Sequence, residues 1–266
     1  MKKKSVSSMI LMIVIMIYLL IPLAVSFVYS VFRKWTNILP EEFHLGNYLS
    51  LFTDADFIAS VGRSVIMCVI PIVLTIVIVL LALFVTVIYF PKLEKYVQII
   101  CMIPYTIQGI ILSVSILSLY VGSSTFLSKR MVMLMGAYCI VILPFIYQGI
   151  RNGMRAVNMP TLIEAAEMLG ASKIYAFFKV IVPNILSAII VSSLLAVGII
   201  FGDYVLIRNL LGTSSPNMQI YLYQTMKSDS TKASAVFVVI MMVTFVITAI
   251  VLYMKSREAK SKVSKK

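Results

Sequence analysis

The chain has 266 residues, of which 61% are hydrophobic and only 12% are charged. Its mean hydropathy is +1.03, and a soluble domain of this length carries about twice as many charged residues. These values exclude an ordinary soluble domain and predict a single multi-span integral membrane domain. The formal net charge of +13 matches the sign needed for nucleic-acid binding, but the lysines and arginines cluster at the ends of apolar runs. We therefore expect membrane lipid as a partner and no nucleic acid.

Six apolar runs follow one another along the chain, and each is long enough to cross about 30 Å of hydrocarbon. The predicted spans are about 9–32, 64–90, 96–120, 131–149, 183–207 and 233–254. They make up a transmembrane domain of residues 9–255, between a cytoplasmic amino terminus at residues 1–8 and a basic cytoplasmic tail at residues 256–266. The predicted fold class is all-α with six transmembrane helices. The first run is too long for the core of a signal peptide, so we expect it to be retained.

The orientation follows from the distribution of positive charge. Six spans place both termini on the same side of the membrane. With the amino terminus inside, fifteen of the 23 lysines and arginines fall in cytoplasmic segments, as the positive-inside rule requires. We therefore expect a multi-pass protein of the plasma membrane with both termini in the cytoplasm.

Two shorter helices are expected between the spans. The mixed loop of residues 33–60 contains Phe43, Asn47 and Tyr48, whose spacing indicates a short amphipathic segment at the membrane interface. A second short helix is expected at residues 220–226, before the sixth span.

Polar residues return within a helical pattern between Pro160 and Pro183. The predicted apolar stripe of this helix consists of Leu162, Ala165, Ala166 and Leu169. Glu164 and Glu167 fall on the opposite face, and Thr161 with Glu164 can form a capping box at the start of the helix. Gly170 can end the helix, because glycine tolerates the left-handed conformation of a sharp turn. We expect a helix-turn-helix whose second helix covers residues 172–178.

The spacing Glu164-Ala165-Ala166, Gly170, Val180-x-Val182-Pro183 resembles the EAA loop of ABC importer permeases with the type I fold. The usual ending is Ile-x-Leu-Pro, and both aliphatic positions hold valine here. In that family the loop is the coupling helix that docks into a cleft of the cytoplasmic ATPase. The resemblance implies a cytoplasmic coupling loop at residues 158–182. Its implied ATPase-coupling residues are Glu164, Ala165, Ala166, Glu167 and Gly170. The alternative is an interfacial helix-turn-helix whose glutamate only caps its own helix.

The resemblance also implies partners. It predicts the permease subunit of an ATP-driven importer in the plasma membrane of a prokaryote. The expected partners are an ABC ATPase dimer, a second permease that is identical or homologous, and an extracytoplasmic solute-binding protein.

The sequence contains none of the motifs that indicate nucleotide binding, metal binding or catalysis. It has no phosphate-binding loop, so ATP and Mg are expected on the partner ATPase, with no cofactor bound by this chain. The spacing of Cys68, Cys101, Cys139 and His44 predicts no metal site. We expect no catalytic residues and no enzymatic activity, and the sequence shows no internal repeat typical of secondary transporters. An ATP-independent channel or scaffold remains the alternative from another class.

A second pattern bears on the solute. Phe201-Gly202-Asp203-Tyr204-Val205-Leu206, then Leu211-Gly212 and Ile220-Tyr221, is similar to polyamine-type permeases. Related systems in that branch carry 2-aminoethylphosphonate, thiamine or ferric iron, so a small polar, polyamine-like solute is the first expectation. Asp203 is the only carboxylate within a predicted span, which makes it a candidate for the solute pathway, with a structural ion pair to Arg208 as the alternative. Tyr204 is either part of an aromatic wall around a cation or a packing residue.

Overall fold

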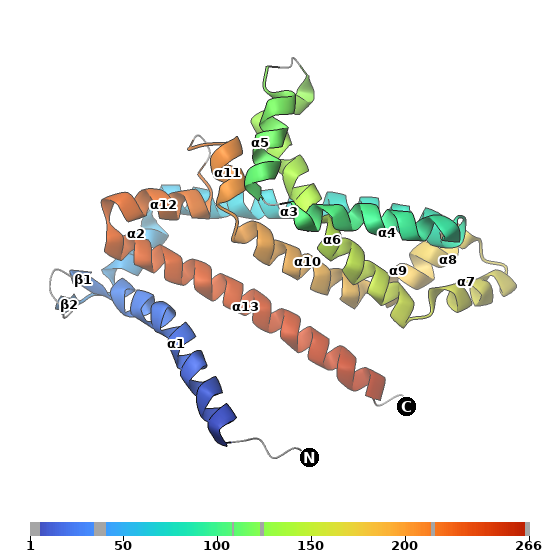
Figure 1. The fold of residues 1–266 in the computed structure, drawn as a ribbon, viewed down its shortest axis with the longest axis horizontal. Helices are drawn as coiled ribbons and strands as arrows, with labels where there is room; N and C mark the ends of the chain where they lie inside the picture. The colour runs from blue at the N-terminus through green and yellow to red at the C-terminus, as the bar shows by residue number, and fades with distance from the viewer. Residues whose placement is uncertain (1–5, 35–40, 108, 123–124, 214–215, 264–266) are drawn as a thin grey trace.

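The computed structural model describes residues 6–34, 41–107, 109–122, 125–213 and 216–263. The first elements are α1 (Val6–Ser30), β1 (Phe32–Lys34), β2 (Glu41–Phe43), α2 (Gly46–Thr53), α3 (Ala55–Ile88), η1 (Pro91–Leu93), α4 (Glu94–Met102), η2 (Ile103–Thr106) and α5 (Gly109–Tyr120). They are followed by η3 (Phe126–Ser128), α6 (Arg130–Ala156), α7 (Met159–Met168), α8 (Lys173–Ala176), η4 (Phe177–Ile181), α9 (Val182–Asn184), α10 (Leu186–Phe201), α11 (Val205–Leu210), α12 (Met218–Ser228) and α13 (Ser230–Val263). The predicted all-α fold class is confirmed, since the strands in the described part of the chain form only a short hairpin (Figure 1).

Among the described residues, four helices are long and apolar enough to cross a membrane, and two bent helix pairs raise the number to as many as six. The four single segments are Met9–Ser30, Ala55–Ile88, Arg130–Ala156 and Ser230–Met254. Pro22, Pro71 and Pro144 all lie inside helices. The helix predicted at residues 220–226 is present within α12, and the amphipathic segment predicted around Asn47 and Tyr48 is helical as α2, whereas Phe43 lies in β2.

The third predicted span, 96–120, is not one straight helix. Its two parts, Pro91–Thr106 and Gly109–Tyr120, meet at an angle of 102°. Pro104 lies in the short 3-10 helix η2, and the chain is extended at Ile107. Proline has no N–H for a helical hydrogen bond, so the helix ends here and α5 leaves in a new direction.

The fifth predicted span, 183–207, is also divided. Helix α10 ends at Phe201, and Val205 begins the separate helix α11. At the other end, Lys173–Asn184 and Leu186–Phe201 meet at 65°. The interval from Gly202 to Tyr204 is therefore a turn between two helices, where an uninterrupted span was expected.

Other helices extend beyond the predicted spans. Helix α3 begins at Ala55, because the Asp54 carboxylate accepts hydrogen bonds from the backbone N–H groups of Asp56 (2.9 Å) and Phe57 (3.4 Å). Helix α6 continues to Ala156, and α13 continues to Val263, within the predicted basic tail of residues 256–266.

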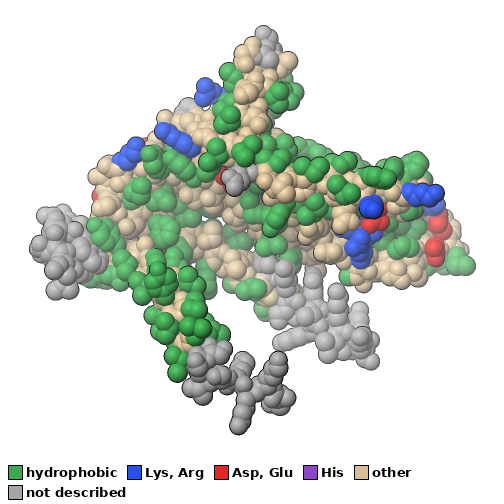
Figure 2. All heavy atoms as spheres, in the orientation of Figure 1, with side chains coloured by type: hydrophobic (Ala, Val, Ile, Leu, Met, Phe, Trp, Pro, Cys, Tyr) green, Lys and Arg blue, Asp and Glu red, His purple; other side chains and the backbone are tan. Residues whose placement is uncertain are grey.

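Helix α10 packs against α3, α6 and α13, and α3 packs against α6, so that these four helices form the main bundle (Figure 1). The most buried side chains of α6 are apolar and include Leu134, Ile142, Ile146 and Ile150. Helices α7–α9 lie at one end of this bundle, and α2 and α12 lie at the opposite end. Figure 2 shows apolar side chains over the middle of the bundle, with Lys, Arg, Asp and Glu gathered towards the two ends. This distribution suits a bundle whose middle lies in hydrocarbon.

The end that carries α2 and α12 is held together by an ionic network. One oxygen of Asp54 accepts hydrogen bonds from the Tyr221 hydroxyl (2.7 Å) and the Lys232 ammonium (2.8 Å). These two hydrogen bonds lower the pKa of Asp54 from 3.8 to about 2, and the bond from Lys232 has the larger effect. The network joins the start of α3 to α12 and α13.

Candidate functional site

The segment that resembles the EAA loop begins with α7. This helix starts at Met159, two residues before the predicted capping box. Pro160 occupies its first turn, where a missing N–H costs nothing. Asn158 precedes it in the left-handed conformation (φ 51°) and makes no side-chain cap, so the capping box predicted for Thr161 and Glu164 was wrong.

Gly170 forms the turn after α7, as predicted. Its φ is +83°, a conformation that side chains with a Cβ disfavour. The Gly170 N–H donates to the Glu167 carbonyl (2.9 Å), and the Ala171 N–H donates to the Ala166 carbonyl (3.0 Å). These two bonds are those of a Schellman motif, which satisfies the last carbonyls of the helix.

The buried face of α7 differs from the predicted stripe. Met159, Ile163 and Ala166 are buried, whereas Ala165 and Leu169 are exposed. The first turn of α7 lies beside the end of α3. A shallow groove of about 190 Å³ separates the two helices. It is lined by Val87, Ile88, Met159, Pro160, Ile163, Glu164, Glu167 and Lys173.

The tip of this segment presents apolar side chains to the outside. Met168 is 91% exposed and Leu169 is 89% exposed, although both belong to residue types that are usually buried. Glu164 and Glu167 are also exposed, and the Glu167 carboxylate lies 3.7 Å from the Lys173 ammonium. The tip therefore combines two apolar side chains with carboxylates, an arrangement that suits contact with another protein.

An aromatic cluster that the sequence analysis missed fixes this tip to the bundle. The second helix of the segment is short, α8, and continues into the π-helical turn η4. There Phe177 is fully buried, and its ring centroid lies 5.0 Å from that of Phe84 on α3 and 5.2 Å from that of Phe178. A displacement of the tip would thus be transmitted to α3 through packed rings.

A second connection at the same end joins α4 to α6. The Glu94 carboxylate accepts a hydrogen bond from Nε of Arg151 (2.6 Å) and lies 3.2 Å from Nη2 of Arg155. We call this pair of contacts the Glu94 clamp. Its two arginines lie three and seven residues after Gln148, so they continue the polar side of α6.

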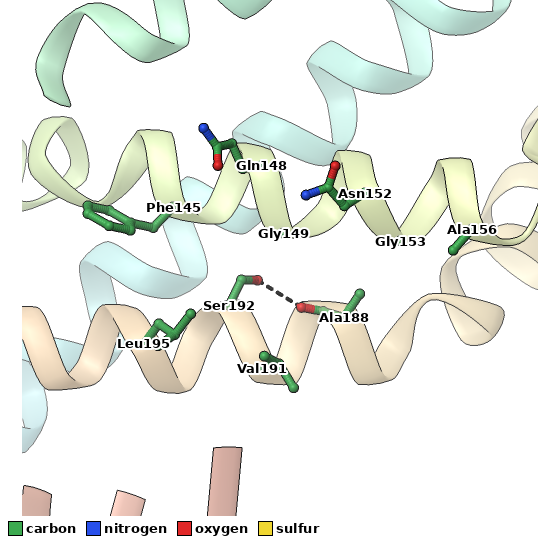
Figure 3. A pocket seen from close by; sticks show the side chains of 10 residues that line it. All are labelled: Phe145, Gln148, Gly149, Asn152, Gly153, Ala156, Ala188, Val191, Ser192 and Leu195. Atoms are coloured by element: carbon green, nitrogen blue, oxygen red, sulfur yellow. Dashed lines mark hydrogen bonds between the residues drawn. The ribbon is translucent and has the colours of Figure 1, made fainter. Parts of the chain in front are cut away.

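A groove of about 330 Å³ with a mixed polar and apolar lining lies between α6 and α10 (Figure 3). Its lining residues are Phe145, Gln148, Gly149, Asn152, Gly153, Ala156, Ala188, Val191, Ser192 and Leu195. Gln148 and Asn152 are exposed and lie one turn apart on the polar side of α6. Figure 3 shows their side chains pointing away from α10. Exposed amides at membrane depth are costly in lipid, which favours a water-filled space or a partner chain beside them.

Small residues hold the two helices of the groove close together. A Cβ on Gly149 would lie 2.4 Å from Cβ of Ser192, and one on Gly153 would lie 2.6 Å from Cβ of Ala188. The sequence carries this signal as Gly-x-x-x-Gly facing Ala-x-x-x-Ser, a spacing that permits close helix packing in membranes. The sequence analysis did not single out these residues.

Asp203 lies in the turn between α10 and α11 and is half-buried. Its carboxylate accepts a hydrogen bond from the Tyr138 hydroxyl (3.1 Å) and one from the backbone N–H of Leu206 (3.2 Å). The alternative expected for it, an ion pair with Arg208, is not among the ion pairs of the described residues. The carboxylate is therefore held by a tyrosine of α6 and by the first turn of α11.

Tyr204 packs against another tyrosine. Its ring centroid lies 5.2 Å from that of Tyr223 on α12. The Arg208 guanidinium and the Lys227 ammonium lie over the Tyr223 ring. The surroundings of Tyr204 are therefore cationic, which does not suit the expected wall around a cation.

Comparisons with known proteins agree with these features. A family profile described as "Binding-protein-dependent transport system inner membrane component" matches residues 79–258, about two thirds of the chain. One similar solved structure is a bacterial ABC transporter involved in the import of the acidic polysaccharide alginate. It has a TM-score of 0.65 and 17% identity, over 94% of each chain. Another is a bacterial alginate ABC transporter in complex with an alginate pentasaccharide-bound periplasmic protein. Its TM-score is 0.60 and its identity 18%, over 82% of this chain and 84% of that one. No curated protein matches the sequence.

Proposed function

This chain belongs to the family of binding-protein-dependent transport system inner membrane components, and from that premise we propose that residues 158–182 couple it to a cytoplasmic ATPase. It is a permease subunit of an ABC importer with the type I fold, a multi-pass membrane protein without catalytic function. The observation that carries the coupling proposal is the exposure of Met168 and Leu169 at the tip of a segment anchored to α3. Glu164, Ala165, Ala166, Glu167 and Gly170 are the proposed coupling residues.

The proposed assembly contains two permease chains, an ATPase dimer that binds ATP and Mg, and an extracytoplasmic solute-binding protein. The family description supports a binding protein, and one similar solved structure holds a periplasmic protein. Nucleotide-driven closure of the ATPases would move the coupling tip, and the ring cluster at Phe84 and Phe177 would pass that movement to the spans. ATPase binding can shift the permease only by preferring one of its conformations.

The solute pathway is proposed to run beside the polar side of α6, where Gln148 and Asn152 are exposed. A polyamine-like solute remains the proposal that the pattern at residues 201–221 favours, with 2-aminoethylphosphonate, thiamine or ferric iron as alternatives. The charges around Asp203 and Tyr204 do not favour a cationic solute there, because Asp203 bonds to Tyr138 and two cations lie near Tyr204.

The proposed location is the plasma membrane of a prokaryote, with the amino terminus inside. The charge distribution along the sequence supports this orientation. It places α7–α9 in the cytoplasm and the α2 and α12 end outside (Figure 1).

Leu169→Glu tests the coupling proposal. Because Leu169 is exposed, the variant should insert and fold normally, whereas a carboxylate at an apolar contact should weaken ATPase retention about tenfold or more. The measurement is the amount of ATPase that co-purifies with the permease from detergent extracts. Leu45→Glu is the matched control, since Leu45 is 55% exposed at the opposite end of the bundle.

Equal ATPase retention by the two variants would contradict the coupling role. If the unaltered chain retains no ATPase, the ATP-independent channel or scaffold would replace the proposed function.

A further inference from the structure

Two positive side chains converge on one tyrosine ring at the end of the molecule opposite the coupling segment. The Arg208 guanidinium carbon lies 5.7 Å from the centroid of the Tyr223 ring, and the Lys227 ammonium lies 4.6 Å from it. Both cations are therefore within roughly 10 Å of each other, about one Debye length at moderate salt. Tyr204 packs on the same ring and completes the group, which we call the Tyr223 cluster: Tyr204, Arg208, Tyr223 and Lys227.

The two helices that carry these cations are held firmly in place. Leu206, Ile207 and Leu210 bury one side of α11. The Asn209 amide also donates a hydrogen bond to the Ser113 hydroxyl on α5 (2.8 Å). Helix α12 is fixed by Tyr221, which is buried and bonded to Asp54. The backbone positions of Arg208 and Lys227 are therefore fixed relative to each other by packed helices.

The nearest carboxylates in the sequence are engaged elsewhere. Asp203 bonds to Tyr138 and to the first turn of α11. Asp229 accepts hydrogen bonds from the backbone N–H groups of Thr231 and Lys232. Neither Arg208 nor Lys227 forms an ion pair within the described part of the chain. A tyrosine face attracts a cation, but it does not offset the repulsion between two of them.

We propose that the Tyr223 cluster binds an oxyanion, a carboxylate or a phosphate-type group, between Arg208 and Lys227. A guanidinium donates paired hydrogen bonds to such a group and an ammonium adds a point charge. The ring face of Tyr204 and Tyr223 gives an attached apolar portion a surface for stacking. Figure 2 shows Lys and Arg side chains exposed over the α11 and α12 end of the molecule. The placement of the cluster outside the cell rests on the proposed function, but the binding of an oxyanion does not.

Protection of Lys227 by inorganic phosphate tests the site directly. The purified complex is treated with an impermeant acetylating reagent, and acetylation of each lysine is followed by mass spectrometry. Phosphate at four times its Kd should slow the reaction of Lys227 about fivefold, because only the unoccupied fraction reacts. Lys129 is the internal control, since it is an exposed lysine over a single ring, Phe126 (5.2 Å), and its rate should not change.

Arg208→Gln should abolish the protection of Lys227, and Arg208→Lys should retain part of it. The inference is overturned if sodium chloride at equal ionic strength protects Lys227 as well as phosphate does, or if Lys129 is slowed equally. Protection that survives Arg208→Gln would also overturn it. If Arg208→Gln does not assemble, the site is still tested in the unaltered chain by whether phosphate slows the acetylation of Lys227 and not that of Lys129.

A second experiment distinguishes the two sources of the oxyanion. ATPase stimulation is measured with the binding protein carrying its natural solute and with the same protein stripped of solute by unfolding and refolding. Neutralising Arg208 and Lys227 together should raise the concentration for half-maximal stimulation about tenfold. The control neutralises the exposed pair Lys129 and Arg130.

A defect with both forms assigns the oxyanion to acidic side chains of the binding protein. A defect only with the solute-loaded form assigns it to the solute. Unchanged stimulation with both forms would show that transport does not use the site. Failure of the coupling proposal would appear as lost ATPase retention and would leave the phosphate protection of Lys227 unaffected.

Discussion

Asp203 is the residue whose environment differs most from the sequence-based expectation. A carboxylate in an apolar run was expected either to face the solute or to pair with Arg208. In the structure it accepts hydrogen bonds from Tyr138 and from the backbone of Leu206, while Arg208 turns to the Tyr223 ring. Neutral donors thus fill the hydrogen-bonding capacity of this carboxylate at the start of α11, and this structural role explains its presence without a bound solute.

Asp203→Asn should assemble almost normally, because asparagine also caps helices and can accept the Tyr138 hydrogen bond. Asp203→Leu should lower the free energy of unfolding by about 1–3 kcal/mol, since the Tyr138 hydroxyl and the Leu206 N–H lose their partner. Thermal unfolding in detergent measures both variants. Adding Arg208→Gln should not rescue Asp203→Leu, as the two side chains do not pair.

Loss of uptake by Asp203→Asn, with normal assembly and normal basal ATPase activity, would contradict the structural role. That result would return Asp203 to the solute pathway and strengthen the case for a cationic solute.

At the scale of elements, the contact between α6 and α10 depends on the absence of side chains. Gly149 and Gly153 lie directly against Ser192 and Ala188, so the helix backbones approach closely beside the groove. In lipid, where the hydrophobic effect does not drive helices together, such close packing supplies much of the association energy. The groove wall is therefore sensitive to a single added carbon.

Gly149→Ala should lower the free energy of unfolding by about 1–3 kcal/mol, because its Cβ would lie 2.4 Å from Cβ of Ser192. The matched control is Gly136→Ala on the same helix, where an added Cβ meets nothing within 4 Å. This control should be neutral or stabilising by up to about 1 kcal/mol, since alanine favours a helix. The measurement is the unfolding midpoint of the purified permease.

Ser192→Gly should partly restore stability to Gly149→Ala, because it removes the Cβ against which the new methyl group collides. If Gly149→Ala and Gly136→Ala are equally stable, the two helices are not in the close contact described here.

At the scale of the whole molecule, the two ends of the bundle carry different chemistry. One end combines the exposed apolar side chains of Met168 and Leu169 with the Glu94 clamp to Arg151 and Arg155. The other end holds the Asp54 network and the Tyr223 cluster. An importer needs such a division, because its energy source and its solute arrive from opposite sides of the membrane.

Cysteine labelling tests which end faces the cytoplasm. In a background without Cys68, Cys101 and Cys139, a cysteine replacing Ser228 should react with an impermeant maleimide on intact cells. A cysteine replacing Lys92 should react only after the membrane is opened. Both positions are exposed at opposite ends of the bundle, so their accessibility reports orientation.

Labelling at position 92 from outside intact cells would place the coupling segment outside as well. The proposed ATPase contact would then be impossible.

By itself the sequence determined the membrane class, the all-α fold and the helix that ends in a turn at Gly170. These follow from local physics, since long apolar runs must form helices in lipid and a positive φ selects glycine. Only the tertiary structure decided the bend near Pro104, the buried face of α7, the partner of Asp203 and the meeting of Arg208 with Lys227. Each of these depends on which distant elements pack together, and helical periodicity along one segment contains no information about its neighbours.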